Sequence, residues 1–499
     1  MESLIIGRSV VIGVADGIPD VRQNTALRQV DGVIVEIGDA DEQRRAHPSA
    51  EIVGSDRHLV TPGFVDSHHH VGLTPLQLGV ESESLELWSL MRMVAPNVDP
   101  YLDTLVSGIE LLKSGVTTVQ HLHGRLRADP RTMTGTDAKI LSAYEHIGLR
   151  ASYSVGVTDQ NRLFATDEDA LVAGLPTPLD SEMAEWLRVR RIPAAAQLEN
   201  GYTRLREQWH GRAGGRIAIQ LAPSNLHWCS DEALELIGEL SERDGVPMHI
   251  HLLETPYQKS YGRLRSPRGA VGHLDSLGLL NERMTLGHAV HATPTDVAMI
   301  AGSGASVCHN PSSNLRLKSG VAPVVRYLEA GVPVALGIDE AGLSDDRDML
   351  LEMKLAYNLH RAPGIGSRVP TVEEVFEMAT SNGAATTPFA GTIGTLEVGM
   401  AADLVVFDAA SIAGAWAHPS LSPLQLVAHR GRPADVDTVM VAGHVVVRGG
   451  RVTTLDEADL AREVAASVRI DEQAAASTRV VSEALIRLAR EHYAGWLTD

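Results

Sequence analysis

The sequence contains little that would support export, a membrane span or a disulfide framework. It has only two cysteines, Cys229 and Cys308, in 499 residues, too few to cross-link a chain of this length and typical of a reducing compartment. Residues 1–13 lack a basic segment followed by a long apolar run, and no window approaches 18 uninterrupted apolar residues. We therefore expect a soluble, cytoplasmic protein with no membrane partner.

Positive charge and aromatic side chains are also scarce. Lysine and arginine total 43 against 63 aspartates and glutamates, which gives a formal net charge of −20. Such an acidic surface repels phosphate backbones, so no nucleic-acid partner is expected. Aromatic residues make up 4% of the chain, but a hydrophobic fraction of 44% still supplies a sizeable aliphatic core.

The middle of the chain has the pattern of a parallel α/β protein. Between residues 61 and 394, short apolar runs alternate with helix-length segments, as in sheets built from β–α units. Eight runs have the character of strands: Leu59–Asp66, Val116–His121, Arg150–Gly156, Arg216–Ala222, Met248–Leu253, Met284–His288, Ala305–His309 and Pro333–Ile338. Eight units and roughly 250 residues predict a closed (β/α)8 barrel of the TIM type.

The two ends of the chain have a different pattern. Strand-like runs occur at Leu4–Val14 and Gly32–Ile37, and again at Gly399–Phe407 and Val436–Val447. We expect these ends, residues 1–60 and 395–452, to share one small β-sandwich domain beside the barrel of residues 61–394. Residues 453–499 have helical spacing and predict a helical extension, either an appendage or a contact in a homo-oligomer.

Histidines gather where the first predicted barrel strand ends. Alternate residues of a strand face the same side, so His68 and His70 can bind one ion while His69 faces away. Imidazole nitrogen is a suitable ligand for zinc or iron. On its own, this pair is equally consistent with a polar strand end.

Four further predicted strands also end in histidine or aspartate. These ends carry His249, His251 and Glu254; His288 and His291; His309; and Asp339. The active sites of barrel enzymes lie at the carboxyl ends of the strands. Histidines with only a structural role would not be expected to concentrate at those ends. The pattern therefore predicts a metal-dependent active site.

The same segments resemble a known family. The run Pro62-Gly63-Phe64-Val65-Asp66-Ser67-His68-His69-His70 is similar to a signature of the amidohydrolase superfamily. One branch contains triazine chlorohydrolases, guanine deaminase and S-adenosylhomocysteine/methylthioadenosine deaminases. The segments that resemble this branch are His251–Glu254, Gly287-His288, His309–Asn314 and Leu336–Asp339, and Gly394–Leu404 resembles the family's return into its β-sandwich. The resemblance covers about residues 1–450 in the right order.

The resemblance implies roles for individual residues. It makes His68, His70, His251 and Asp339 the ligands of one divalent ion, zinc by preference and iron as the alternative. It also makes Glu254 the carboxylate that moves protons to the ring nitrogen and leaving group, and His288 the residue that orients the attacking water. A bound cation lowers the pKa of water toward ~7, Asp339 can accept the released proton, and a carboxylic acid can protonate the departing group.

A single ion is favoured over two. No lysine occurs around Ser152–Asp159, where a carbamylated lysine would bridge a second metal.

Nine residues near the predicted strand ends are candidates for contact with a small-molecule substrate: Gln77, Trp88, His121, His123, Asn225, His227, Trp228, His309 and Asn314. Gln77 and Trp88 could offer an amide and a flat face to a heterocycle, although a buried helical tryptophan is an equal alternative. The histidines at 121 and 123 either contact substrate or form hydrogen bonds behind it. The segment Ala222–Trp228 differs from the usual deaminase pattern.

Three other residues have structural interpretations that we prefer. We expect His249 to face the helical layer of the barrel, His291 to be structural, and Glu340 to pair with Arg347 rather than to recognise an amino group.

The leading functional interpretation is a hydrolytic deaminase that releases ammonia from an amino-substituted nitrogen heterocycle. Hydrolysis of a cyclic amide, a urea-type amide or a carbon–halogen bond uses the same attack by water, and similarity of fold does not separate these reactions. A barrel that binds metal without catalysis is the third interpretation.

Overall fold

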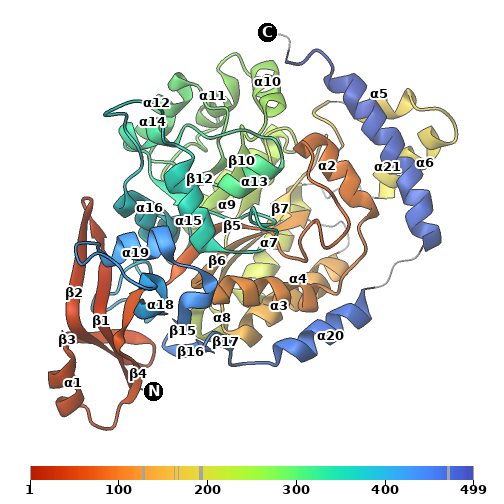
Figure 1. Cartoon of the computed structure of the whole chain (residues 1–499). Helices are drawn as coiled ribbons and strands as arrows, with labels where there is room; N and C mark the ends of the chain where they lie inside the picture. The colour runs from red at the N-terminus through yellow and green to blue at the C-terminus, as the bar shows by residue number, and fades with distance from the viewer. Residues whose placement is uncertain are drawn as a thin grey trace.

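The computed structural model describes residues 2–125, 130–161, 163–166, 168–189, 195–468 and 472–497. Figure 1 shows a barrel surrounded by helices, with a sheet formed by the two ends of the chain at its lower left.

The barrel consists of two parallel sheets that meet at both edges. One contains β5 (Phe64–His69), β6 (Val116–Arg125), β7 (Arg150–Val157) and β8 (Ile217–Ile219), with the short β9 (Ala222–Pro223) also paired to β7. The other contains β10 (Met248–Leu252), β11 (Met284–His288), β12 (Ser306–His309) and β13 (Val334–Leu336). Parallel bridges pair His69 with Asp339 at one junction, and Leu221 with Met248 and Asn225 with His251 at the other. The predicted α/β barrel is confirmed.

The first predicted barrel strand, Leu59–Asp66, is divided between two sheets. β4 (Glu51–Pro62) belongs to the terminal sheet, and β5 begins at Phe64 in the barrel. Gly63 lies at the break, where a Cβ atom would come within 2.2 Å of the Thr117 hydroxyl oxygen. This close approach lets the chain pass from one sheet to the other.

Helices follow the barrel strands and cover the ring from outside (Figure 1). They are α2 (Leu85–Met91), η1 (Arg92–Val94), α3 (Pro100–Lys113), α4 (Pro130–Ile147), α5 (Glu168–Ala173), α6 (Leu179–Val189), α7 (Ala195–Trp209), α8 (Arg212–Gly215), α9 (Asp231–Asp244), α10 (Pro256–Arg265), α11 (Gly269–Ser276), α12 (Pro294–Ser303), α13 (Pro311–Arg316), α14 (Val324–Glu329), α15 (Met349–Asn358), α16 (Val372–Ala379) and α17 (Ser381–Ala385). None of the described helices is both long enough and apolar enough to cross a membrane.

Helix α9 illustrates how the sequence sets these elements. The Ser230 side chain accepts a hydrogen bond from the Ala233 amide and caps the first turn, and Gly245 ends the helix with φ 62°. Leu234, Ile237 and Leu240 lie on the buried face. Their helical spacing packs one side of α9 against the barrel core.

The two ends of the chain share one eight-stranded, sandwich-like sheet. Its order is β17-β16-β15-β14-β4-β1-β2-β3, built from β1 (Glu2–Ala15), β2 (Ile18–Val30), β3 (Val33–Asp39), β4, β14 (Leu404–Asp408), β15 (Val436–Val441), β16 (His444–Arg448) and β17 (Arg451–Val452). The ends join where β14 runs antiparallel to β4, with Leu404 opposite Pro62. Helices α1 (Ala40–Ala46), α18 (Ala409–Ala413), α19 (Pro423–Arg430) and η2 (Pro433–Asp435) complete this region. The domain boundaries given above stay a prediction.

The C-terminal segment is helical, as predicted. Helix α20 (Glu457–Ser467) contacts α3, and α21 (Glu472–Tyr493) contacts α2 and η1. Leu485 and Ala489 of α21 are buried in an apolar cluster with Leu90, Phe164 and Met183. Figure 1 shows α21 running beside α2, with α5 and α6 on its other side. The last long helix therefore packs on segments that emerge from the barrel.

A buried ion pair connects the barrel to the terminal sheet. Arg150, at the start of β7, donates two hydrogen bonds of 2.8 and 2.9 Å to the carboxylate of Asp403, just before β14. Both side chains are almost completely buried. The Asp403 carboxylate also accepts a bond of 2.7 Å from the Ala442 amide, so it ties three segments together.

We predict that Asp403→Asn lowers the free energy of unfolding by about 3–5 kcal/mol, because it leaves the buried Arg150 charge without a counter-ion. Urea unfolding followed by tryptophan fluorescence measures the change. Glu51→Gln is the control, since Glu51 pairs with Arg448 in the same sheet at 2.8 Å but both side chains are half exposed. Its cost should stay below about 1 kcal/mol, and equal costs for the two variants would contradict the argument.

Candidate active site

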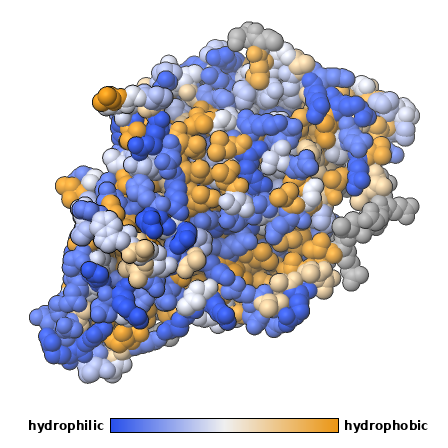
Figure 2. Space-filling view, in the orientation of Figure 1, coloured by the Kyte–Doolittle hydropathy of each residue, from blue (hydrophilic) through white to orange (hydrophobic). Residues whose placement is uncertain are grey.

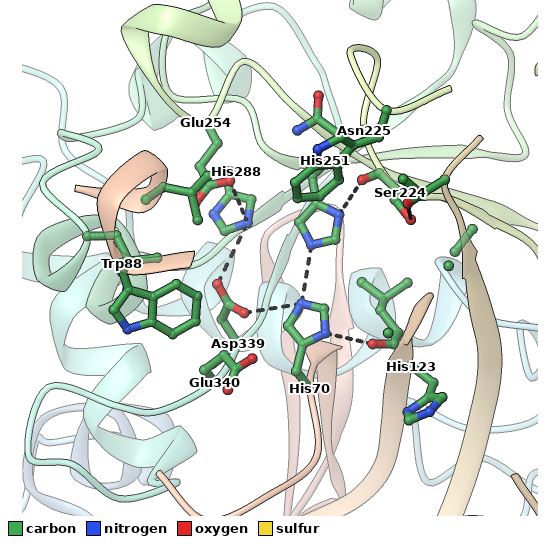
Figure 3. Close-up of a pocket in the computed structure, with 18 residues that line it drawn as sticks. His70, Trp88, His123, Ser224, Asn225, His251, Glu254, His288, Asp339 and Glu340 are labelled. Atoms are coloured by element: carbon green, nitrogen blue, oxygen red, sulfur yellow. Dashed lines mark hydrogen bonds and ion pairs between the residues drawn. The ribbon is translucent and has the colours of Figure 1, made fainter. Parts of the chain in front are cut away.

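The functional side chains meet at the carboxyl ends of the barrel strands, beside one cavity of about 210 Å³ that is partly open to solvent. Figure 3 shows His70, His251, His288, Glu254 and Asp339 pointing toward one another at one end of this cavity. Its wall also contains apolar side chains: Leu85, Trp88, Leu122, Trp228 and Leu317. The arrangement is a polar cluster inside an apolar pocket, as in small-molecule sites.

Backbone carbonyl groups fix the orientation of two of the histidines. The Nδ1 atom of His70 lies 2.6 Å from the Leu122 carbonyl oxygen, and Nδ1 of His251 lies 2.6 Å from the Ser224 carbonyl oxygen. A carbonyl oxygen can only accept, so Nδ1 carries the proton in both rings. The lone pair of each Nε2 atom therefore faces the cavity. Metal-binding histidines are commonly oriented in this way, with the other ring nitrogen donating a hydrogen bond to a backbone carbonyl or a carboxylate.

His68 is held by another histidine. Its Nδ1 atom lies 2.8 Å from Nε2 of His249, while its own Nε2 atom is buried without a hydrogen-bond partner among the described residues. The expectation that His249 faces the helical layer is wrong. His249 and His251 are two residues apart on β10, so both face the barrel interior.

The Nε2 atoms and one carboxylate come within the spacing of a metal site. Nε2 of His70 lies 3.2 Å from Nε2 of His251 and 3.4 Å from Oδ1 of Asp339, and Nε2 of His68 lies 3.8 Å from the same oxygen. Ligand atoms of His68, His70 and Asp339 lie within 4.8 Å of one another, as do those of His68, His251 and His288. Unprotonated nitrogens this close require a cation between them, so these residues fit one divalent ion.

Electrostatics favour the metal-binding protonation states. Burial lowers the pKa of His68 well below its ordinary value and that of His251 to about 3, with neighbouring histidines adding to the effect. Both rings are neutral at pH 7. Burial raises the pKa of Asp339, but His70, His288 and a hydrogen bond from Ser313 outweigh it and leave the pKa below its usual range. The cluster therefore combines neutral imidazoles with an ionised carboxylate, the forms that bind zinc.

Glu254 and His288 lie next to the cluster. Oε2 of Glu254 lies 3.9 Å from Nε2 of His288, which is 3.7 Å from Oδ2 of Asp339. Nδ1 of His288 contacts Oδ1 of Asn314 at 2.9 Å, so Nε2 faces the cavity. Burial raises the pKa of the Glu254 carboxyl, although Gln258 donates a bond of 3.3 Å to it. A carboxyl whose pKa is raised and one whose pKa is lowered thus flank the same histidine.

The backbone is strained where these side chains leave their strands. Leu253, His288, Ala289 and Asp339 have φ values of 52°, 68°, 44° and 69°, in the left-handed region that residues other than glycine rarely adopt. The Asp339 amide donates a hydrogen bond of 2.7 Å to the His68 carbonyl oxygen. The Ala289 amide donates one of 3.1 Å to the Leu252 carbonyl oxygen. Such strain is typical of functional sites, where surrounding contacts hold it in place.

Comparison with known proteins identifies the family. Residues 59–446 match the amidohydrolase family model. The chain belongs to the amidohydrolase family. A 5-methylthioadenosine/S-adenosylhomocysteine deaminase of Desulforudis audaxviator is 31% identical over 93% of this chain and 98% of the relative. A 5'-deoxyadenosine deaminase of Methanosarcina mazei is 29% identical over 93% and 97%.

Solved structures agree on the fold of this amidohydrolase. An adenosine deaminase from Xanthomonas campestris with bound zinc superposes with a TM-score of 0.75 at 23% identity, covering 96% of this chain and 98% of that one. Atrazine chlorohydrolase from Arthrobacter aurescens, complexed with zinc, gives 0.76 at 20% identity, with 93% and 100% covered. The predicted class, an enzyme acting on carbon–nitrogen bonds other than peptide bonds, is confirmed. The family and the histidine/aspartate cluster together support a divalent metal cofactor.

Four of the nine predicted substrate contacts line the cavity of the amidohydrolase: Trp88, His123, Asn225 and Trp228. The other five lie outside its wall. Gln77 accepts a hydrogen bond of 2.8 Å from the Thr74 amide, and His121 is buried against the Tyr144 hydroxyl at 3.0 Å. His227 contacts Asn225 at 2.9 Å, His309 contacts His360 at 3.0 Å, and Asn314 contacts His288. Direct substrate contact by any of the nine stays a prediction.

Glu340 lines the cavity in a way that the sequence did not indicate. Its carboxylate pairs with the Arg92 side chain, which lies 5.0 Å above the Trp88 ring. The expectation of a Glu340–Arg347 pair is wrong: Arg347 donates to the Glu340 backbone carbonyl and pairs with Glu110 at 2.9 Å. Residues 92 and 340 are too far apart in the chain for spacing to reveal their contact. His291, as expected, is structural in position, 2.7 Å from the Ser319 carbonyl oxygen.

We predict that His249→Ala weakens metal affinity about 10–100-fold, because His68 loses the group that orients its ring. Competition with a chelator of known affinity measures the change. His291→Ala is the matched control, since this imidazole lies outside the cluster, and it should leave the affinity unchanged. Equal affinities for His249→Ala and the unaltered protein would rule out the positioning role.

Proposed function

We propose that this amidohydrolase is a hydrolytic deaminase of adenosine-type nucleosides, with one zinc ion as cofactor. The position of Glu254 carries the proposal. A buried carboxyl faces the cavity beside His288 and the metal-binding cluster, where it can protonate an amino group that leaves a ring. The names of the relatives, adenosine-type deaminases that cover nearly the whole chain, support the same reaction.

In this proposal His68, His70, His251 and Asp339 hold the ion, because their ligand atoms converge. When bound, the ion supplies a Lewis acid that makes water acidic near neutral pH. Asp339 accepts the proton of the attacking water through its ionised carboxylate. His288, 3.7 Å from Asp339 through Nε2, orients the water and the oxygen that develops on the ring carbon.

Glu254 and Asp339 divide the proton transfers between them. Burial raises the pKa of the Glu254 carboxyl, while the neighbouring histidines and a hydrogen bond from Ser313 hold the pKa of Asp339 below its usual range. Opposed pKa shifts at neighbouring carboxyls are the pattern of an acid and a base in one site. Glu254 therefore donates its proton to the ring nitrogen. It then passes to the amino group the proton that Asp339 took from the water, so that ammonia departs, and it recovers the proton of the hydroxyl left on the ring carbon.

The apolar wall suits a purine. Trp88 is buried except for a small part of its surface, and Leu85, Leu122 and Leu317 extend the wall. These side chains offer a flat, water-poor surface for the base, which strengthens hydrogen bonds and charge interactions at its reacting edge.

Other features stay predictions that belong to this proposal: zinc rather than iron, assembly as a homo-oligomer, and a cytoplasmic location. Hydrolysis of a carbon–halogen bond or a cyclic amide is the alternative use of the same cluster. It would yield halide or acid from the corresponding compounds and no ammonia from adenosines.

We predict that Glu254→Gln lowers kcat for deamination by about 10²–10⁴-fold, because a general acid–base residue contributes about that factor. The metal content should not change, since only proton transfer is removed. Ammonia release from adenosine, 5'-deoxyadenosine, 5'-methylthioadenosine and S-adenosylhomocysteine measures the rate. Glu282→Gln, at an exposed glutamate, is the control. Turnover by Glu254→Gln close to that of the unaltered enzyme would exclude the assigned role.

A further inference from the structure

One acidic side chain on the wall of the main cavity has no part in the proposed reaction. Glu254 and Asp339 move protons there, whereas Glu340, the third acid among the described lining residues, is not used. Figure 3 shows Glu340 beside Asp339, on the side of the pocket away from Glu254. Because the Asp339 amide bonds the His68 carbonyl oxygen, the residue that follows has a fixed place relative to the metal-binding cluster.

Two arginines hold Glu340 in place. Arg347, which is almost completely buried, donates a hydrogen bond of 3.2 Å to the Glu340 backbone carbonyl oxygen. Arg92, from η1 just after α2, pairs with the Glu340 carboxylate. The Glu340 side chain is 15% exposed, so water and salt screen this pair only in part. Residue 340 therefore connects the end of a barrel strand to the segment that carries Trp88.

Arg92 also covers the tryptophan of the cavity wall. Its guanidinium carbon lies 5.0 Å from the centre of the Trp88 ring, within the range of a cation–π contact. A planar guanidinium can stack on a ring and bond a carboxylate at the same time. Trp88 itself is 7% exposed, lines the cavity and packs with Val80 and Leu317. The contacts that begin at Glu340 therefore end on the surface proposed for the base.

Polar contacts also fasten the segment that leads to this tryptophan. Residues 70–84 join β5 to α2 without a helix or a strand. The Thr74 hydroxyl donates a hydrogen bond of 2.6 Å to the Asp345 carboxylate, and Glu83 pairs with Lys318 at 2.5 Å. Figure 2 shows a mixture of hydrophilic and hydrophobic residues on the surface in this region. Because polar contacts at a surface open more readily than a packed core, the segment can loosen while the barrel strands stay folded.

We propose that Glu340 is a positioning residue, which acts through Arg92 to hold the Trp88 ring against the base of the substrate. The inference rests on the proposed function, because it takes the tryptophan as the surface on which a purine lies. Without the pair, the ring would be in its binding position for only part of the time. The apparent affinity for substrate then falls by that fraction, whereas the metal-binding and proton-transfer groups of the bound complex stay the same. KM should therefore rise while kcat does not change.

A direct hydrogen bond from the substrate to the Glu340 carboxylate is the alternative, and the two interpretations predict different results for Arg92. If Glu340 acts through Arg92, the loss of either partner has the same effect, and the loss of both adds nothing further. If Glu340 binds the substrate itself, the loss of Arg92 leaves the carboxylate in the cavity, and KM stays close to that of the unaltered enzyme.

The first test measures KM and kcat for ammonia release from 5'-deoxyadenosine by the metal-loaded enzyme. Glu340→Gln and Arg92→Met should each raise KM about tenfold, as expected for the loss of one hydrogen bond between charged groups, with kcat within about threefold. The double variant should match the single ones, and neither change should raise KM further in a Trp88→Leu background. Glu199→Gln is the control and should leave KM unchanged, because Glu199 pairs with Arg243 at 2.8 Å on the outer helices α7 and α9.

A KM that rises in Glu340→Gln but not in Arg92→Met, effects of the two changes that add, or a fall in kcat as large as the rise in KM would overturn the inference.

Hydrogen exchange gives a second readout that does not depend on turnover. The backbone amides of residues 85–94 should exchange faster in Glu340→Gln and Arg92→Met than in the unaltered protein or in Glu199→Gln, because the pair restrains α2 and η1. Unchanged exchange would also overturn the inference. If the unaltered enzyme releases no ammonia from any adenosine, the proposed deamination fails, while the exchange rates still decide whether Glu340 holds this wall.

Discussion

The hydrogen bonds from His70 to the Leu122 carbonyl and from His251 to the Ser224 carbonyl determine what this site can do. They favour the tautomer that carries its proton on Nδ1, so the unprotonated Nε2 atoms of the two rings face each other at 3.2 Å. Two lone pairs at that distance repel, and the repulsion is relieved only by a proton or a cation. Since burial disfavours the proton, the barrel is built to hold a metal ion.

Both bonds depend on the alignment of neighbouring strands, and the His251–Ser224 bond also depends on closure of the barrel. Leu122 lies on β6, next to β5, and Ser224 lies beside β10 where Asn225 pairs with His251. A shift of either neighbour by one residue would replace a carbonyl by an amide and reverse the preferred ring state. The alignment of β5 with β6, and of β10 with the segment after β9, therefore also fixes the orientation of the metal-binding histidines. The buried Arg150–Asp403 pair attaches the terminal sheet to β7, the strand next to β6.

Much of this arrangement could be predicted because it is local. Apolar runs of strand length locate β5–β8 and β10–β13, and the two-residue period of a strand places His68 and His70 together. The same period applies to His249 and His251. It places both side chains on the inner side of β10, so the outward orientation expected for His249 was inconsistent with the two-residue period. The apolar pattern predicts one strand across Gly63, but the chain changes sheets there. This break depends on the close approach of Gly63 to Thr117, a contact that the local pattern does not indicate.

The rest depends on contacts between distant segments. Arg92 pairs with Glu340, and the Tyr493 ring of α21 packs against Tyr257 of α10. Spacing in a single chain carries no record of such pairs. The helical character of residues 472–493 was evident, but its place over the pocket follows from burying Leu485 and Ala489 against Leu90. The pocket wall thus depends on contacts between segments far apart in the sequence. The positions of the metal-binding residues follow largely from where the strands end and from their two-residue period.

X-ray absorption spectroscopy at the zinc edge of the metal-loaded enzyme tests the central claim most directly. The account predicts a first shell of nitrogen and oxygen scatterers at about 2.0–2.2 Å, with the outer-shell pattern of imidazole rings and one ion per chain. It also predicts no metal–metal vector near ~3.5–4 Å, the spacing of paired-metal sites. A sulfur scatterer, a second metal at that distance, or a shell without imidazole would contradict it.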